Sequence, residues 1–401
     1  MGRIEINIQS IIRFIGNALF LMLILVILID PANTLLHKKD IIFVLLTAYC
    51  IVFYKPDFSK LPFIGLMVTA LLIPWLISVM SMRNTDITEV LPMFKAIAPT
   101  ILLLWVHEFD LLRLSRFPVL LSCLLMDILF VFVLIFPEIE AGLYYFGSIE
   151  NKSIMIARRW FLGHEFFFMY LKSTVAMLFV VTYYIHKCLH KELRSFGSVI
   201  AILIILFYFM FSGTRSTMLA PFFLLGTCMF ATYRDNPKAK LIFYPILFVT
   251  GILMLILVIM LVIDVNEASN VVKYGHLSSY AELFENNPWI LLTGQGPGAY
   301  FYSNGFSSWV LQTEWTYLDL IRWYGCFSIL IVAVFAYPLI ALWKHRSDKL
   351  TYELFWTYAA YLAIAGTNPL LMSSTGMLAM LIIYSYREVI IKKNVTHAYE
   401  T

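Results

Sequence analysis

The sequence predicts an all-α polytopic membrane protein of about twelve transmembrane helices, with residues 1–401 forming one integral membrane domain. Two observations predict this class. Of 401 residues, 61% are hydrophobic and only 13% are charged, whereas soluble domains carry about 25% charged residues. Apolar runs of helical length recur along the whole chain, and no glycine/serine-rich linker or soluble domain interrupts them.

The apolar runs define the expected transmembrane segments. The first run resembles a signal peptide because Arg3 and Arg13 precede it. However, it is about 19 residues long and Asp30-Pro31-Ala32-Asn33 follows it in place of a cleavage site, so we expect it to be retained. The runs lie at residues 11–29, 40–54, 61–80, 92–106, 117–136, 168–186, 196–211, 217–232, 241–263, 315–342, 354–366 and 370–390.

The distribution of lysine and arginine predicts the orientation of these segments. With a cytoplasmic N-terminus, most of the 29 basic residues fall on the cytoplasmic side, as the positive-inside rule requires. Both termini are then cytoplasmic, and two long outer loops remain, near 137–167 and 264–313. These loops are rich in glycine and aromatic residues, which argues against disorder and favours a function.

Composition excludes several classes of function. The net charge of +4 is too small to indicate nucleic-acid binding. The five cysteines lie in or beside apolar runs without paired spacing, and histidines, cysteines and aspartates show no ligand spacing. We therefore expect no disulfide framework, metal site or cofactor.

A turn between two expected helices, Ser212-Gly213-Thr214-Arg215-Ser216, places a guanidinium beside apolar segments without an acidic neighbour in sequence. A charge at the end of a transmembrane segment is costly unless it snorkels, pairs or lines a polar cavity. The hydroxyls and amides of this turn suit an anion, so Arg215 is a candidate anion ligand.

The first outer loop ends in a polar cluster, Arg158-Arg159 followed by His164-Glu165. Basic residues are unfavourable on the outer side, and a phosphate ligand would explain them. His164 with Glu165 is a candidate acid/base pair. The alternative is ordinary polarity at the membrane interface.

The second outer loop contains Gly294-Gln295-Gly296-Pro297-Gly298. Three glycines within five residues allow backbone amides to approach a ligand closely and to form an anion-binding nest. A plain loop turn is the alternative interpretation. A dinucleotide fold is excluded, because no strand-then-helix context surrounds the glycines.

Further candidates flank the last long apolar run. Glu314 is expected in the first turn of a helix, where the helix dipole favours a carboxylate, and Asp319 is expected to pair with Arg322 on one helix face. His276 is a second acid/base candidate in the same outer loop. An interfacial helix start explains the neighbouring aromatic residues but not Arg322.

Taken in order, three of these segments resemble the Wzy-type O-antigen and polysaccharide repeat-unit polymerases and the related O-antigen ligases. They are the Arg215 turn, the Gly294–Gly298 loop, and the entry from Glu314 to Gly325 into the next helix; the Arg158–Glu165 segment is similar to an arginine–glycine stretch of the family. The resemblance covers most of residues 155–390. Ligases usually carry a histidine-containing stretch where this chain has Gln312-Thr313-Glu314-Trp315, which favours a polymerase.

The resemblance implies a metal-independent glycosyltransferase of the bacterial inner membrane, active on the periplasmic face. Its substrate is an undecaprenyl-diphosphate-linked oligosaccharide, its product O-antigen or a related polysaccharide of lipopolysaccharide biosynthesis. Membrane lipid and a chain-length regulator are further candidate partners. Arg215, Arg322, Arg158 and Arg159 are then candidates for the diphosphate, Gly294, Gln295, Gly296 and Gly298 for the glycan, and Glu314, His276 and His164 for the general base. The alternatives are an O-antigen ligase and, from another class, a transporter or flippase of lipid-linked sugars.

Overall fold

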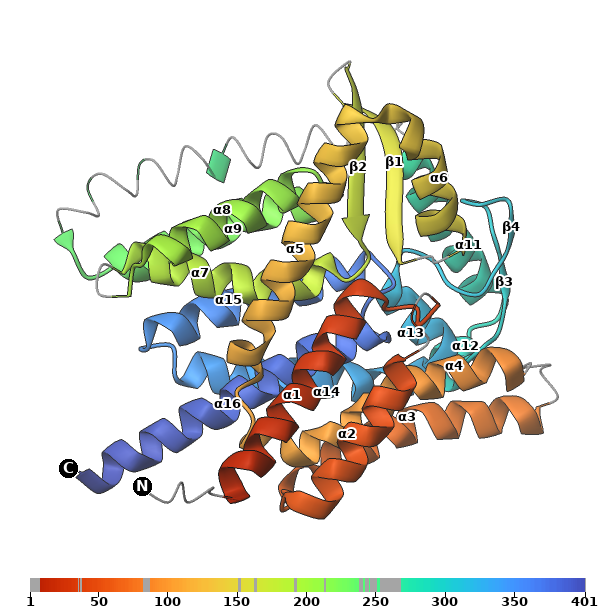
Figure 1. Ribbon diagram of the computed structural model, residues 1–401. Helices are drawn as coiled ribbons and strands as arrows, with labels where there is room; N and C mark the ends of the chain where they lie inside the picture. The colour runs from red at the N-terminus through yellow and green to blue at the C-terminus, as the bar shows by residue number, and fades with distance from the viewer. Residues whose placement is uncertain are drawn as a thin grey trace.

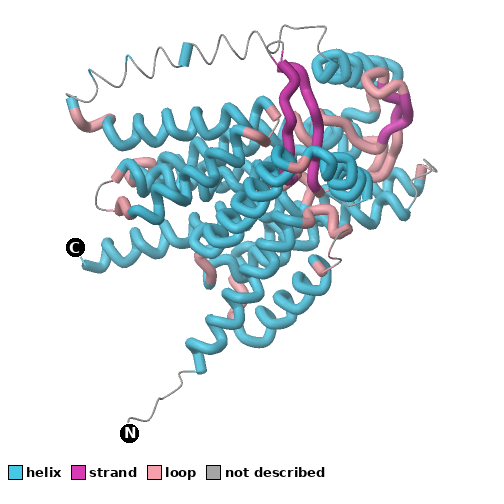
Figure 2. Tube along the Cα trace, turned by 45° about the horizontal axis from the view of Figure 1, so that its top comes forward, coloured by secondary structure: helices cyan, strands magenta, loops and turns pink. Residues whose placement is uncertain are grey.

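The computed structural model is a bundle of helices with a layer of short elements at one end (Figures 1 and 2). It describes residues 8–34, 36, 38–81, 87–150, 153–161, 164–190, 193–212, 214–237, 241, 245, 251–252 and 268–400. Within these residues, seven helical stretches are long and apolar enough to cross a membrane. These are Ile8–Ile29, Phe58–Met80, Thr88–Glu108, Leu111–Ile135, Arg215–Tyr233, Thr316–Lys344 and Ser374–Lys392. The expectation of a helical membrane protein is confirmed at this level.

The remaining expected segments are shorter or less apolar than a full membrane span. Residues 40–54 fall mainly on α2 (Lys39–Phe53), 196–211 on α8 (Phe196–Met210) and 354–366 on α15 (Lys349–Gly366). Residues 168–186 are divided among β2 (His164–Leu171), η5 (Thr174–Met177) and α7 (Leu178–Leu189). Nearly all of 241–263 lies outside the described residues. The count of twelve therefore stays a prediction.

The described residues up to Ile135 form five α-helices. They are α1 (Ile8–Ile29), α2 (Lys39–Phe53), α3 (Leu61–Met80), α4 (Ile87–Ile97) and α5 (Leu111–Ile135), with 3₁₀ turns η1 (Phe58–Lys60) and η2 (Ala98–Glu108). Pro92 lies inside α4, and Pro99 lies near the start of η2, which continues the same path through the bundle.

The second half contains the rest of the bundle. Its long helices are α7 (Leu178–Leu189), α8 (Phe196–Met210), α9 (Arg215–Tyr233), α13 (Thr316–Tyr324), α14 (Ser328–Lys344), α15 (Lys349–Gly366) and α16 (Ser374–Glu400), with η5 (Thr174–Met177) before α7 and η6 (Gly325–Phe327) before α14. α16 is the central helix. Met377, Met380 and Tyr384 are fully buried there, and the helix packs against α1, α5 and α14.

Polar side chains mark where several of these helices begin. Asp110, Ser195, Thr214 and Asp348 each precede a helix and accept a hydrogen bond from a backbone N–H in its first turn. Such caps satisfy amides that have no partner within the helix. In a chain this apolar, these caps fix the helix boundaries that hydropathy alone leaves undefined.

Both expected outer loops contain regular structure. The first holds η3 (Pro137–Ile139), α6 (Glu140–Tyr144), the π-helical turn η4 (Tyr145–Glu150) and a hairpin of β1 (Ile154–Phe161) with β2 (His164–Leu171). The second holds α11 (Ala268–Asn286), α12 (Ile290–Thr293) and a small hairpin of β3 (Phe301–Ser303) with β4 (Ser308–Val310). The apolar run expected to begin a helix at 168 is instead strand until Leu171, because it pairs with β1.

These elements lie together at one end of the bundle, away from the start of α1 and the end of α16 (Figure 1). The turns α1–α2, α8–α9 and α15–α16 are at the same end; the backbone N–H of Met169 in β2 donates to Phe211 O at 3.2 Å. We call this the hairpin end. It contains every candidate residue named from the sequence that the structure describes.

Candidate functional site

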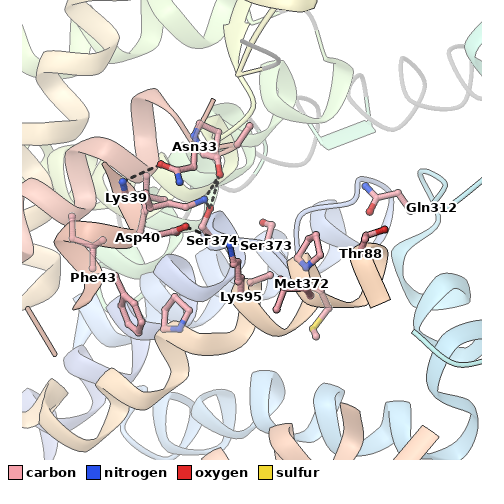
Figure 3. A pocket seen from close by; sticks show the side chains of 18 residues that line it. Asn33, Lys39, Asp40, Phe43, Thr88, Lys95, Gln312, Met372, Ser373 and Ser374 are labelled. Carbon is pink, nitrogen blue, oxygen red and sulfur yellow. Dashed lines mark hydrogen bonds and ion pairs between the residues drawn. The ribbon is translucent and has the colours of Figure 1, made fainter. Parts of the chain in front are cut away.

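A cavity of about 590 Å³ opens at the hairpin end, where the α1–α2 turn, α4 and the α15–α16 turn meet (Figure 3). Side chains from α1, α2 and α4 make much of its wall apolar, and the turns supply polar groups. The apolar residues include Leu23, Ile27, Phe43, Leu91, Pro92 and Pro99; the polar residues are Asn33, Lys39, Asp40, Thr88, Lys95, Gln312, Ser373 and Ser374.

Two lysines and one aspartate give this cavity an excess of positive charge. Lys39 is half-buried, and its Nζ donates to Pro31 O at 2.6 Å and to Ser374 Oγ at 3.3 Å. Lys95 lies 4.0 Å from Asp40, and both side chains are more than half exposed, so this pair is weak. The ammonium of Lys39 donates to two neutral oxygens, an arrangement suited to an anion, and the carboxylates of Asp40 and Asp30 also act on its charge.

The wall beside Lys39 is held by a buried carboxylate. Asp30 is fully buried at the end of α1 and accepts hydrogen bonds from the backbone N–H of Thr34 and Leu36, at 3.0 and 2.7 Å. Its Oδ1 also accepts from Ser153 Oγ at 3.0 Å, just before β1. The α1–α2 turn and the long hairpin are therefore fixed to each other beside the cavity.

The guanidinium of Arg322 is hydrogen-bonded to other groups of the protein. All five of its N–H groups donate within the chain. The acceptors are Asp319 Oδ1, twice, with Gln295 Oε1, Ala299 O and Leu311 O. The expected pairing of Asp319 with Arg322 is confirmed, at 2.8 Å, and both side chains are almost completely buried. Because a guanidinium has only five donors, Arg322 as it stands here has no N–H group left over for a diphosphate, and its direct role in diphosphate binding stays a prediction.

The glycine loop does not present an anion-binding nest. Gly294, Gly296 and Gly298 have φ of 72°, 98° and 83°, a backbone conformation that favours glycine. However, the amides of Gly294, Gln295 and Gly296 donate to main-chain carbonyls, two of them at the end of α13. A Cβ on Gly294 would come within 2.2 Å of Trp323 O. The close approach that these glycines permit is to the protein's own backbone.

Glu314, an acid/base candidate, lies beside α11, the helix that also carries His276. Glu314 lies just before α13, not in its first turn as expected, and its Oε2 is 3.4 Å from Lys273 Nζ. Trp315 Nε1 donates to Lys273 O at 3.2 Å. Gln312, two residues before Glu314 in sequence, lines the cavity, whereas Glu314 itself does not.

His276 is fully buried against the small hairpin. Its Nδ1 and Ser303 Oγ are 2.6 Å apart, and its Nε2 has no hydrogen-bond partner among the described residues. Burial lowers the pKa of His276 below its ordinary value, with Lys273 acting in the same direction; Glu314 and Asp319 oppose the shift. The imidazole is therefore neutral near pH 7 and closed off from solvent.

Arg158 is already neutralised by carboxylates. Its Nε and Nη2 donate to the two oxygens of Glu140, at 2.8 and 2.5 Å, and Nη1 lies 3.4 Å from Glu165. The hydrogen bond from Arg158 holds the pKa of Glu140 below its ordinary value. This contact joins α6 to β1 and gives Arg158 a structural partner, and its role in phosphate binding stays a prediction. Arg159 and His164 are in β1 and β2 by their backbone pairing, and their side chains lie outside the described residues.

Arg215 is the first residue of α9, at the hairpin end. Its side chain is half-buried, and Nη1 donates to Asn270 Oδ1 of α11 at 3.5 Å. The hydroxyls that we expected to suit an anion are hydrogen-bonded within the turn. Ser212 Oγ is 2.6 Å from Thr217 Oγ1, which also contacts Thr214. Arg215 stays a candidate cation, whereas these hydroxyls cap the helix.

Sequence reasoning missed Lys39 and Lys95, the cations of the cavity. Neither forms a motif with its neighbours in sequence, and only the packing of α1, α2, α4 and the α15–α16 turn brings them together. It also missed His186 with His190, although a spacing of four on a helix is a metal-ligand signal.

No known protein family, curated protein or solved structure matches this chain.

Proposed function

We propose that the chain is an inner-membrane glycosyltransferase that polymerises undecaprenyl-diphosphate-linked oligosaccharide repeat units into O-antigen or a related surface polysaccharide. The observation that supports this most is the cavity around Lys39 and Lys95. It combines excess positive charge with apolar walls at the end of a membrane-embedded bundle. An isoprenoid diphosphate has the matching chemistry, an anionic head on an apolar chain.

In this proposal Lys39 and Lys95 bind the diphosphate head, and the apolar residues of α1 and α2 face the first isoprene units. Charge-assisted hydrogen bonds from ammonium groups are suited to phosphate oxygens. A polymerase binds two lipid-linked substrates. Arg215, which does not line the cavity, is a second cationic position at the same end of the bundle.

The reaction requires a nucleophile, a leaving group and a base. A sugar hydroxyl of one lipid-linked unit attacks the anomeric carbon of the other; the bond from that carbon to the diphosphate oxygen breaks, and the cations stabilise the departing diphosphate. Of the two candidate bases whose side chains the structure describes, Glu314 is the better placed, because its side chain is 39% exposed whereas His276 is fully buried. Lys273 Nζ lies 3.4 Å from Glu314 Oε2 and forms an ion pair with this carboxylate.

The transporter alternative predicts buried charges in the middle of the bundle. Among the described residues, buried charges instead lie near helix ends or in a short helix: Asp30 follows α1, Lys60 precedes α3, Glu353 is in the first turns of α15, and Asp319 and Arg322 pair within the nine-residue α13. This distribution favours chemistry at one surface. A ligase would use the same face and the same cations, so structure alone does not separate it from a polymerase.

Purified protein incubated with lipid-linked repeat units tests the proposal. A polymerase produces a ladder of lipid-linked products differing by one repeat unit. In a deletion strain, a lost polymerase leaves surface glycans of a single repeat, and a lost ligase leaves long polymer unattached to lipid A core. Absence of any ladder from folded protein, together with unchanged surface glycans in the deletion strain, would refute the proposal.

A further inference from the structure

We propose that His186, His190 and Glu353 form a binding site for a divalent transition-metal ion, best suited to Zn²⁺, at the end of the bundle opposite the hairpins. His186 is in the last turn of α7, and His190 is the residue that follows the helix. Glu353 is in the first turns of α15, which packs against α7. Each side chain offers one ligand atom, and these atoms lie within 4.8 Å of one another.

Local structure positions the two histidines on one face. They are four residues apart, and the backbone N–H of His190 donates to His186 O at 3.1 Å, which continues the helical path. Their ring centroids are 4.3 Å apart. Pairs of histidines at this spacing are a recurrent way for a helix to supply two nitrogen ligands.

One oxygen of the buried Glu353 carboxylate accepts no hydrogen bond from the described residues. Its side chain is fully buried, and Oε2 lies 2.7 Å from His186 Nδ1. The other oxygen, Oε1, is buried without a hydrogen-bond partner among the described residues. A buried carboxylate oxygen left in this state is costly, and a cation between the carboxylate and the imidazoles would satisfy it.

The donor set selects the type of ion. Two imidazole nitrogens and one carboxylate oxygen suit Zn²⁺ and its neighbours, whereas Mg²⁺ and Ca²⁺ prefer oxygen ligands alone. The buried thiol of Cys228 borders the same carboxylate, which also favours a thiophilic ion. Tetrahedral Zn²⁺ holds ligand atoms about 3.4 Å apart. The separations here range from 2.7 Å to at most 4.8 Å, so side-chain rotation is sufficient to close the site.

A bound ion would fasten α7 to α15. The hydroxyls of Thr182 and Thr357 join the same two helices at 2.6 Å, one turn further into the bundle. The ion would therefore reinforce an existing contact at the helix ends. Its role is structural, independent of the proposed glycosyl transfer at the hairpin end.

The test uses full-length protein in detergent, purified without a polyhistidine tag and stripped with a chelator. Calorimetric titration with Zn²⁺ and elemental analysis after desalting are expected to give one ion per chain, with a higher Tm for the loaded protein. Co²⁺ in place of Zn²⁺ is expected to give the visible absorption of a tetrahedral site.

Substitutions of the proposed ligands test where the ion binds. His186→Ala and Glu353→Gln are expected to abolish stoichiometric binding, whereas His345→Ala, a histidine outside the cluster, is expected to retain it. If folded wild-type protein binds no stoichiometric Zn²⁺, or if His186→Ala binds as much as wild type, the site does not exist. Because the wild-type titration needs no variant, misfolding of a variant cannot hide that result.

Discussion

Arg322 connects the glycine loop, the segment before α13 and α13 itself through a single side chain. Its guanidinium also lies over the Phe301 ring, 4.4 Å from the centroid, which adds β3 to the same assembly. An arginine in a membrane protein is often assigned to a ligand on the grounds that its burial is costly. Here the cost is offset by Asp319 and three carbonyl-type oxygens. Arg322 acts by holding the cavity's surroundings in place.

Replacing Arg322 tests this role. Arg322→Met leaves the buried carboxylate of Asp319 without its partner, and we expect a loss of about 3–5 kcal/mol in the free energy of unfolding. The double variant Arg322→Met/Asp319→Asn removes that charge and is expected to recover part of the loss. Thermal unfolding in detergent measures both, with the exposed Arg113→Met as control. Equal stability of Arg322→Met and wild type would contradict the assignment.

His276 predicts how stability depends on pH. Because burial lowers the pKa of His276 in the folded state, the unfolded chain binds a proton more readily as pH falls below the ordinary histidine pKa of 6.5. Stability is therefore unaffected by this group well above pH 6.5 and falls as pH decreases from that value towards the folded pKa.

The measurement compares Tm between pH 5 and pH 8 for wild type and His276→Gln, which retains a hydrogen-bonding group for Ser303. We expect the variant to lose less stability on the acid side, while His345→Gln follows wild type. Parallel Tm profiles for wild type and His276→Gln would show that His276 is not held neutral by the fold.

At the scale of elements, the glycine loop packs against the end of α13. Gly294 lies against the backbone of Trp323 and Tyr324, and Gly325, with φ of 55°, lies against Leu292 O from the other side. Two chain segments thereby approach at their main chains, and only glycine permits both the positive φ and the contact. The α1–α2 turn is joined to the long hairpin by a side-chain hydrogen bond, from Ser153 Oγ to Asp30 Oδ1.

Gly294→Ala is expected to destabilise the protein by several kcal/mol. Its Cβ would come within 2.2 Å of Trp323 O, and the positive φ adds about 1–2 kcal/mol of strain. Gly65→Ala is the matched control, because a Cβ there meets nothing within 4 Å and the position is inside helix α3. Thermal unfolding of the two variants should differ clearly. A Gly294→Ala protein as stable as Gly65→Ala would show that the loop does not pack as described.

At the scale of the whole molecule, hydropathy predicts most of the helices because burial in lipid or protein requires continuous apolar runs. Asp319 with Arg322 was also predictable, since their spacing places them on one helix face. The long hairpin was not, because its aromatic strand 164–171 runs directly into an apolar helix and has no separate signal. The lysines of the cavity come from segments separated by more than fifty residues, and the cavity exists only through packing.

The dependence on tertiary packing also explains why the roles of the arginines and glycines could not be predicted. Their residue types indicated a charge that needs a partner and a backbone that another group can approach closely. Which partner satisfies that chemistry depends on tertiary structure, and for Arg322, Arg158 and the glycine loop the partner is the protein itself. Only where tertiary packing leaves a cation facing a cavity, as at Lys39 and Lys95, does the residue type point to a ligand.

The rate of ladder formation by purified Lys39→Gln/Lys95→Gln protein tests most directly that this cavity binds the lipid diphosphate. Loss of charge-assisted contacts of about 1.5–3 kcal/mol predicts a decrease in kcat/KM on the order of 10- to 100-fold. Lys55→Gln, an exposed lysine at the opposite end of the bundle, should leave the rate unchanged. A folded double variant that polymerises lipid-linked repeat units as fast as wild type would contradict the account.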